Sequence, residues 1–197
     1  MAYLSGGLIL YVLFRVFRKK EKTPNETHKS KFPLPIFPNP VKSDLTYEEL
    51  FNWLRLKESV TYTAKRDGQD NKGNPKFSIG MGHQIQPGEE YLFNRTISEQ
   101  EVRDLFKKDI EKVVQDVDSV VKVPLNKNQK LALVSIRYNV GPGGFRSGNL
   151  LSTLNSGDYQ KTSFLIPNFI VTSNGGVYNQ GLANRRRTEA VLFSKPI

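Results

Sequence analysis

The segment FPLPIFPNP at residues 32–40 limits most strongly how this chain folds. Five of the chain's eleven prolines fall between residues 24 and 40: Pro24, Pro33, Pro35, Pro38 and Pro40. Prolines at this density favour extended polyproline geometry, which rises about 3.1 Å per residue and acts as a semi-rigid spacer. An SH3-type ligand has the same composition. We therefore expect residues 18–44 to form a basic, proline-rich linker and residues 45–197 to form the folded domain.

The first seventeen residues, MAYLSGGLILYVLFRVF, contain a single charged side chain, Arg15. A helix of this length rises about 25 Å, slightly less than the roughly 30 Å of a bilayer's hydrocarbon core. The cluster RKKEK at residues 18–22 follows at once, as is typical where a helix leaves an anionic membrane surface. A cleaved signal peptide has its positive charge before the apolar run. This order predicts a retained transmembrane anchor at residues 1–17, ahead of a cleaved signal or a buried helix.

The formal net charge of +10 is divided equally between two unequal parts of the chain. Residues 1–44 hold eight Lys and Arg against three acids, and residues 45–197 hold twenty-one against sixteen, so each part contributes +5. The domain's basic residues are interspersed with acids and form no recognised nucleic-acid motif, so we expect no nucleic-acid partner. There are no cysteines, and only His28 and His83 among the histidines, so we expect no disulfide, metal or cofactor.

Residues 45–197 show regular secondary-structure signals. Thr46 to Glu49 and Ser98 to Glu101 each match a capping box, and apolar residues at helical spacing follow both. Glycines and prolines between residues 58 and 83 predict short strands and turns. Further helices are expected at 128–139, 149–156, 158–166 and 184–193. The order predicts an α+β fold with a small β-hairpin lobe and a larger helical lobe.

Several motifs in this domain resemble those of the phage-type lysozymes, the endolysins of glycoside hydrolase family 24. Glu58 is followed by Asp67 and then by Ser78-Ile-Gly-Met-Gly-His83, close to the family's run of Glu, Asp and Thr-Ile-Gly-x-Gly-His. The later segments of the resemblance are VPLNKNQKLALVSIRYNVGPGGF at 123–145, LLSTLNSGDY at 150–159 and GLANRRRTEAVLF at 181–193. Together they span about residues 45–197 in the family's order, which implies a lysozyme-like fold.

The resemblance also implies catalytic roles for three residues. Glu58 matches the general acid, and at the end of the helical row 50–54 its carboxyl is expected against apolar surface, which favours the protonated form. Asp67 matches the second carboxylate, which activates water on the opposite sugar face. Asp70 in Asp70-Asn-Lys-Gly73 is the alternative, and either is equally explained as a turn aspartate. Ser78 replaces the family's threonine and retains the hydroxyl that holds water, so slightly slower turnover is expected.

Three further residues match family positions around the substrate. Arg185 is expected beside the acid and pointing inward, with Arg187 pointing outward, unless residues 185–187 are simply a solvated charge run. Tyr138 and Asn139 suit stacking and hydrogen bonding to an N-acetyl sugar, although a core tyrosine and a helix-capping asparagine are the plain alternatives. His83 is expected to bond within the lobe rather than take part in catalysis.

The resemblance implies a muramidase that cleaves the β-1,4 bond between N-acetylmuramic acid and N-acetylglucosamine of bacterial peptidoglycan. Two alternatives stay open, a lytic transglycosylase acting on the same bond and a non-catalytic wall-binding component of a virion. The expected partners are peptidoglycan and, through residues 1–17, a lipid membrane. The expected location is a virion membrane or the cytoplasmic membrane of the infected host, for wall penetration or host lysis.

Overall fold

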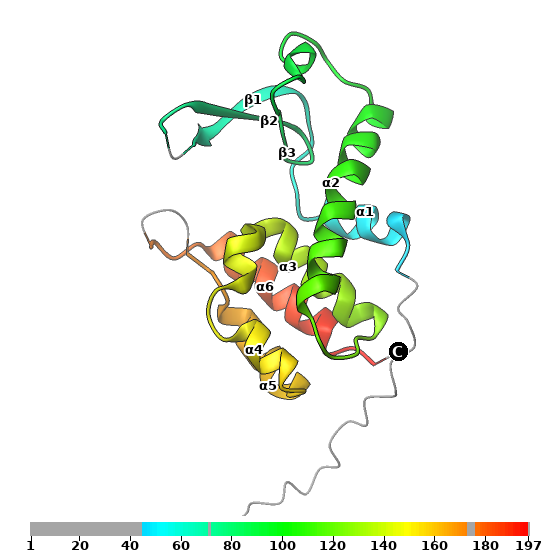
Figure 1. The fold of residues 1–197 in the computed structure, drawn as a ribbon, viewed down its shortest axis with the longest axis vertical. Helices are drawn as coiled ribbons and strands as arrows, with labels where there is room; N and C mark the ends of the chain where they lie inside the picture. The colour runs from blue at the N-terminus through cyan, green and yellow to red at the C-terminus, as the bar shows by residue number, and fades with distance from the viewer. Residues whose placement is uncertain (1–44, 71, 173–175, 197) are drawn as a thin grey trace, which may run out of the picture. The chain divides into compact units, whose positions relative to one another are not determined.

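The computed structural model describes residues 45–70, 72–172 and 176–196. The predicted anchor at residues 1–17 and linker at residues 18–44 lie outside these ranges. Within the ranges, every helix is too short or too polar to span a bilayer. The described chain has two lobes, a small sheet and a larger group of helices, which confirms the predicted α+β class (Figure 1).

The small lobe is a three-stranded antiparallel sheet in the order β1-β2-β3. Its strands are β1 (Thr61–Gln69), β2 (Pro75–Gly80) and β3 (His83–Gln84). The predicted hairpin therefore gains a short third strand, because Gly80 and Gly82 adopt φ values of 66° and 94° that let the chain turn back. The 3₁₀ turn η1 (Glu90–Leu92) follows β3.

Both predicted capping boxes are confirmed. Thr46 caps α1 (Tyr47–Arg55), and its hydroxyl accepts a hydrogen bond from the Glu49 amide. Ser98 caps the 22-residue helix α2 (Glu99–Val120) in the same way through Glu101. One face of α2 is buried along its whole length through Val102, Phe106, Ile110, Val113 and Val117. This stripe explains why α2 packs against both lobes (Figure 1).

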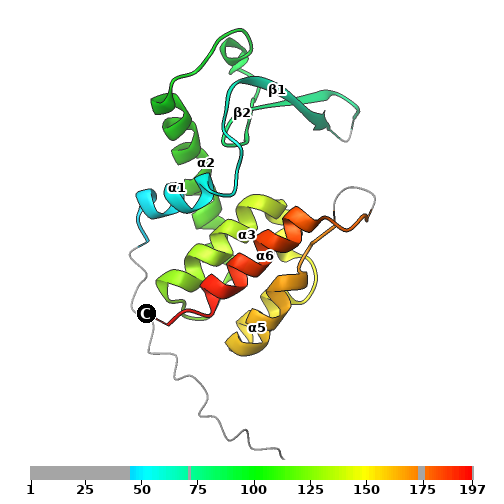
Figure 2. The ribbon, with the colours of Figure 1, turned by 180° about the vertical axis from the view of Figure 1, so that it is seen from behind.

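The helical lobe is built around the pair α3 and α6, which lie side by side in both views (Figures 1 and 2). Its elements are α3 (Lys127–Arg146), α4 (Leu150–Asn155), α5 (Tyr159–Leu165), the 3₁₀ turn η2 (Ile166–Asn168) and α6 (Gln180–Phe193). The predicted helices therefore all form, but α6 begins four residues earlier than expected. The reason is that the Asn179 side chain caps it by accepting from the Leu182 amide.

The end of α3 differs from the prediction of a helix that ends at Asn139. Helical structure resumes after a kink at Gly141, whose φ of 72° and ψ of 173° interrupt the helix. Pro142 then starts a second helical piece, where its missing N–H and fixed φ are compatible with a first turn. Arg137 and Arg146, on either side of the kink, both bind the carboxylate of Asp116 on α2, which fixes the two pieces relative to α2.

A cluster of aromatic rings joins α1, α2 and α3 where the two lobes meet. The ring of Phe106 on α2 lies 5.4 Å from Phe51, 5.7 Å from Tyr47 and 5.8 Å from Tyr138, measured between centroids. Phe51 and Phe106 are fully buried. Burying a phenylalanine side chain contributes about 1.5–3 kcal/mol. This cluster fixes the base from which Glu58 and Tyr138 project.

Candidate active site

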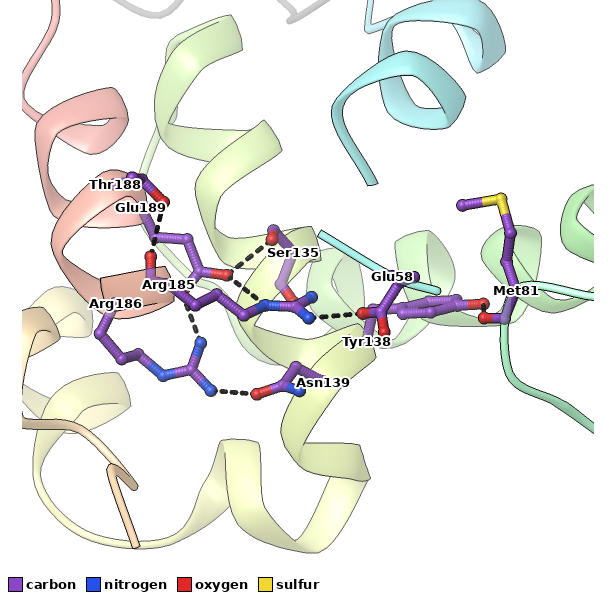
Figure 3. Close-up of polar contacts among 9 residues, drawn as sticks. All are labelled: Glu58, Met81, Ser135, Tyr138, Asn139, Arg185, Arg186, Thr188 and Glu189. Carbon is purple, nitrogen blue, oxygen red and sulfur yellow. Dashed lines mark hydrogen bonds and ion pairs between the residues drawn. The ribbon is translucent and has the colours of Figure 1, made fainter. Parts of the chain in front are cut away.

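Glu58 lies three residues after the end of α1. Its amide still bonds the Leu54 carbonyl at 2.9 Å, so the chain completes one more helical turn beyond Arg55 and this sets the side-chain direction. The carboxylate is 22% exposed. The Arg185 guanidinium donates to it at 2.5 Å (Figure 3). The structure gives this carboxyl the arginine neighbour that the resemblance implied, and not the purely apolar setting expected from the helical row 50–54.

Arg185 points inward from α6, as predicted. Its side chain is 8% exposed, and it donates to Glu58, to the Ser135 carbonyl at 3.3 Å and to Glu189 at 3.1 Å. Arg187, also as predicted, points outward: it is exposed and donates to the side-chain oxygen of Asn184 at 2.8 Å. The alternative of a wholly solvated arginine run is therefore wrong.

Arg186 and Glu189 form a buried pair that the sequence did not predict. Neither side chain has any exposed surface. Arg186 donates to Glu189 at 2.5 Å, to the Phe169 carbonyl at 2.8 Å and to the Asn139 side-chain oxygen at 2.5 Å. Burial lowers the pKa of Arg186 from its usual value, but the Glu189 carboxylate opposes this and favours the charged form. Because leaving a buried charge unpaired is costly, these contacts stabilise the positions of the Arg186 and Glu189 side chains.

A groove of about 530 Å³ opens beside Glu58. It brings together Glu58, Asn139 and Arg185, three of the predicted site residues. The other lining residues come from the end of α1 and from α6 and its approach: Leu56, Lys57, Asn179, Gly181, Leu182, Asn184 and Thr188. An acid, a guanidinium and several amides in one groove suit a polar ligand rich in hydroxyl and amide groups.

Asn139 and Tyr138 end the first piece of α3 and face different surroundings. Asn139 accepts from Arg186 through its side-chain oxygen, which leaves its NH₂ group as the donor for a ligand in the groove. The Tyr138 ring packs against Phe106, and its hydroxyl donates to the Met81 carbonyl at 2.8 Å. Burial raises the pKa of the Tyr138 hydroxyl. These contacts match the alternative in which Tyr138 is a core residue. Its stacking on a sugar stays a prediction.

The structure separates the two candidate second carboxylates. Asp70 forms the turn between β1 and β2: its carboxylate accepts from the amides of Lys72 and Asn74, both at 2.8 Å, and from the Asn74 side chain. Hydrogen bonds from Asn74 lower the pKa of Asp70. Asp67, on β1, is exposed and makes one long contact at 3.4 Å with the Gln84 side chain. Asp70 is thus a turn aspartate, while the role of Asp67 as the second carboxylate stays a prediction.

Ser78 lies on the central strand β2, opposite Lys65 on β1 and Gln84 on β3. Directly paired residues in an antiparallel sheet share a face, so Ser78 and Gln84 lie on one face. Gln84 also reaches Asp67. The sheet therefore groups Ser78 with Asp67, while neither residue lines the groove beside Glu58.

His83 makes structural bonds, as predicted, but one of its two partners lies on α2 and not within the small lobe. The buried imidazole lies between Asp109 on α2, at 2.7 Å from Nδ1, and Glu89, at 2.8 Å from Nε2. The hydrogen bond to Asp109 is the largest cause that raises the pKa of His83. Burial pushes the pKa of Glu89 upward, but hydrogen bonds from Lys108, the Gln86 amide and His83 outweigh it and lower that pKa to about 2. His83 thus ties the sheet to α2.

Known proteins resemble this chain in sequence and in fold. The family model described as Phage lysozyme matches residues 57–189. The endolysin of Salmonella phage P22 is 34% identical over 141 residues, which is 68% of this chain and 93% of that protein. A solved endolysin from Escherichia coli O157:H7 phage FAHEc1 superimposes with a TM-score of 0.64 at 26% identity, over 79% of this chain and 96% of that one.

Some other relatives are much longer than this chain, and some are named as a separate type of endolysin. The chain spans less than half the length of the endolysin of Bacillus phage PZA, at 36% identity over 118 residues, 60% of this chain and 44% of that protein. Several relatives are named SAR-endolysins, including that of Enterobacteria phage P21, which is 31% identical over 113 residues. The family model covers Glu58, the sheet, the buried arginines and every groove residue except Leu56. This chain belongs to the phage lysozyme family.

Proposed function

We propose that this protein is a peptidoglycan hydrolase that cleaves the β-1,4 bond between N-acetylmuramic acid and N-acetylglucosamine, with Glu58 as general acid. The observation that carries the proposal is the Glu58 carboxylate, held by Arg185 in a groove that Asn139 also lines. Membership of the phage lysozyme family supports the substrate class.

In the proposed reaction Glu58 transfers its proton to the glycosidic oxygen as the bond from that oxygen to the anomeric carbon breaks. A water molecule adds to the anomeric carbon, and Asp67 takes up the proton that this water loses. An inverting hydrolase of this kind needs its two carboxylates about 6.5–9.5 Å apart so that water fits between them. Ser78, on the same sheet as Asp67, orients the water through its hydroxyl.

The groove side chains bind the sugar chain. The NH₂ group of Asn139 donates to an acyl oxygen of an N-acetyl group, because its own oxygen is occupied by Arg186. Tyr138 lies behind Glu58 and contributes by fixing the loop at Met81, with any stacking on sugar secondary (Figure 3). Arg185 orients Glu58 by holding one of its carboxylate oxygens.

The test is the clearing of a peptidoglycan suspension by the full chain and by Glu58→Gln. The amide has the size of the acid but no proton of suitable acidity, so clearing is expected to fall below detection. The matched control is Glu99→Gln, since Glu99 is also an arginine-paired glutamate but binds Arg55, away from the groove. Glu99→Gln is expected to clear at the wild-type rate. Clearing by Glu58→Gln at that rate would refute the assignment.

We also propose that residues 1–17 hold the enzyme at a membrane, that residues 18–44 form a spacer and that residues 45–197 form the catalytic domain. The apolar run with its single Arg15, the basic cluster after it and the SAR-endolysin relatives support membrane association. The setting is a phage, at the host's cytoplasmic membrane or in a virion membrane. The full chain is expected to float with anionic vesicles, and Leu10→Lys is expected to abolish flotation.

A further inference from the structure

Glu189 is the most deeply buried acid of the described chain and does not line the groove. Its carboxylate accepts hydrogen bonds from Arg185 at 3.1 Å, from Arg186 at 2.5 Å and from the Ser135 hydroxyl at 2.6 Å. A buried ionic group of this kind is often no more stabilising than apolar residues of similar volume. Stability alone therefore does not explain its place beneath the site.

The two oxygens of Glu189 connect to two different residues of the groove. Oε1 accepts from Arg185, whose opposite end binds Glu58. Oε2 accepts from Arg186, whose opposite end binds Asn139. Figure 3 shows that the guanidinium group of Arg185 lies between Glu189 and Glu58. The guanidinium group of Arg186 likewise links Glu189 to the side chain of Asn139. A single arginine side chain therefore separates the Glu189 carboxylate from Glu58, and another separates it from Asn139. Glu58 and Asn139 are the two residues proposed to contact the substrate.

We propose that Glu189 is a positioning residue for the hydrolase, which controls the charge that Arg185 presents to Glu58 and fixes the amide of Asn139 through Arg186. This inference rests on the proposed function. Glu189 itself touches neither the sugar nor the bond that breaks.

The electrostatic part follows from what a general acid needs. Arg185 places a positive charge beside Glu58, and the charges around a general acid must allow it to enter the reaction with its proton. The charged groups near Glu58 are Arg185 and Arg186 from α6 and Lys57 beside it in the groove, and the Tyr138 hydroxyl from α3 is also near. Glu189 binds both guanidinium groups and so offsets their positive charge near Glu58.

The geometric part concerns the side-chain amide of Asn139. A planar amide can flip, exchanging its oxygen and nitrogen. Arg186 has only donors, so its bond to Asn139 fixes the oxygen inward and the NH₂ toward the groove. Glu189 in turn holds Arg186 in place through the opposite side of the guanidinium. Without Glu189, Arg186 keeps its bond to the Phe169 carbonyl but loses its carboxylate partner, so the donor that the substrate meets is held less firmly.

The experiment compares the full-length wild type with Glu189→Gln on soluble peptidoglycan fragments, measuring the pH profile of cleavage, KM and the melting temperature. The alkaline limb of the profile is expected to move down by about one pH unit, since the variant leaves the positive charge of the two arginines uncompensated. KM is expected to rise about 2- to 10-fold, which corresponds to the net free energy of one hydrogen bond to the substrate. The matched control is Glu89→Gln, because Glu89 is also a buried acid that binds two cationic groups.

Both variants are expected to melt at a lower temperature, but only Glu189→Gln is expected to move the alkaline limb and KM. If Glu189→Gln lowers the melting temperature but leaves the alkaline limb of the pH profile and KM at their wild-type values, the role of Glu189 is purely structural. That result would overturn the proposal. If Glu189→Gln does not fold, Glu189→Asp replaces it. Aspartate retains the charge but is one methylene shorter, so KM is expected to rise while the limb stays; an unchanged KM would overturn the proposal.

The wild type is measured first, which separates the two possible failures. A wild type that cleaves nothing refutes the proposed function, and the positioning role falls with it. A wild type that cleaves, beside a Glu189→Gln enzyme with unaltered limb and KM, refutes the positioning role alone.

Discussion

Replacing His83 by glutamine tests how the sheet is tied to α2. The imidazole is 3% exposed and bonds Asp109 and Glu89 at 2.7 and 2.8 Å. Hydrogen bonds to charged groups contribute about 1.5–3 kcal/mol each. Glutamine can restore one of the two, and Glu89 keeps its bond from Lys108. We therefore expect a loss of about 3 kcal/mol, the low end for breaking a buried ion pair.

The effect depends on pH with a definite sign. The pKa of His83 is raised in the folded state, so its stabilisation is complete below the ordinary value of 6.5 and is lost as the pH rises through the raised value. The pKa of Glu89 is lowered from 4.5 to about 2, so its contribution is present above pH 4.5 and is lost as the pH falls toward 2. The difference between wild type and His83→Gln is thus largest between pH 4.5 and 6.5.

Thermal unfolding of the full chain in detergent, followed by circular dichroism from pH 4 to 10, measures this difference. At about 2–4 °C per kcal/mol for a domain of this size, the variant is expected to melt roughly 6–12 °C lower near pH 6. The gap is expected to narrow in alkaline buffer. A gap that is constant from pH 6 to 10, or that widens, would show that the charged imidazole is not what holds the sheet.

Four further substitutions test other contacts. Asp67→Asn is expected to lower the cleavage rate at least 100-fold while Asp70→Asn keeps it and lowers only thermal stability; equal rates for both variants would contradict the assignment of Asp67. Tyr138→Phe, which removes the bond to the Met81 carbonyl, is expected to cost about 1 kcal/mol of unfolding free energy in urea titration, and an unchanged midpoint would show that the bond contributes nothing. Ser78→Thr is expected to raise turnover slightly by restricting the hydroxyl's rotamer, and unaltered kcat would remove that argument.

Much of the fold was predictable because its signals are local. The capping boxes at Thr46 and Ser98 depend on residues three positions apart, and both helices begin where those residues predict. The course of α3 was not predictable in this way. Gly141 and Pro142 predict a helix end, but the second helical piece depends on Asp116 of α2, which binds arginines on both sides of the kink.

The candidate site was predictable to the extent that family motifs carried it. Those motifs indicated Glu58 and Arg185, and the structure pairs them. Arg186 and Glu189 were missed because consecutive charged residues in a helix are usually solvated. A signal was present nevertheless: Glu189 follows the two arginines by three and four residues, the spacing of neighbours on a helix. That spacing is equally common on exposed faces, so only packing against α3 and η2 distinguishes the two cases.

The central claim, that Glu58 donates the proton when peptidoglycan is hydrolysed, is tested most directly by mass spectrometry of the soluble products. The wild type is expected to release muropeptides that end in a reducing N-acetylmuramic acid and contain one oxygen atom from solvent water. Glu58→Gln, with an unaltered melting temperature, is expected to release none. Release of the same muropeptides by Glu58→Gln at the wild-type rate would contradict the claim, and products ending in an anhydro-sugar would contradict hydrolysis.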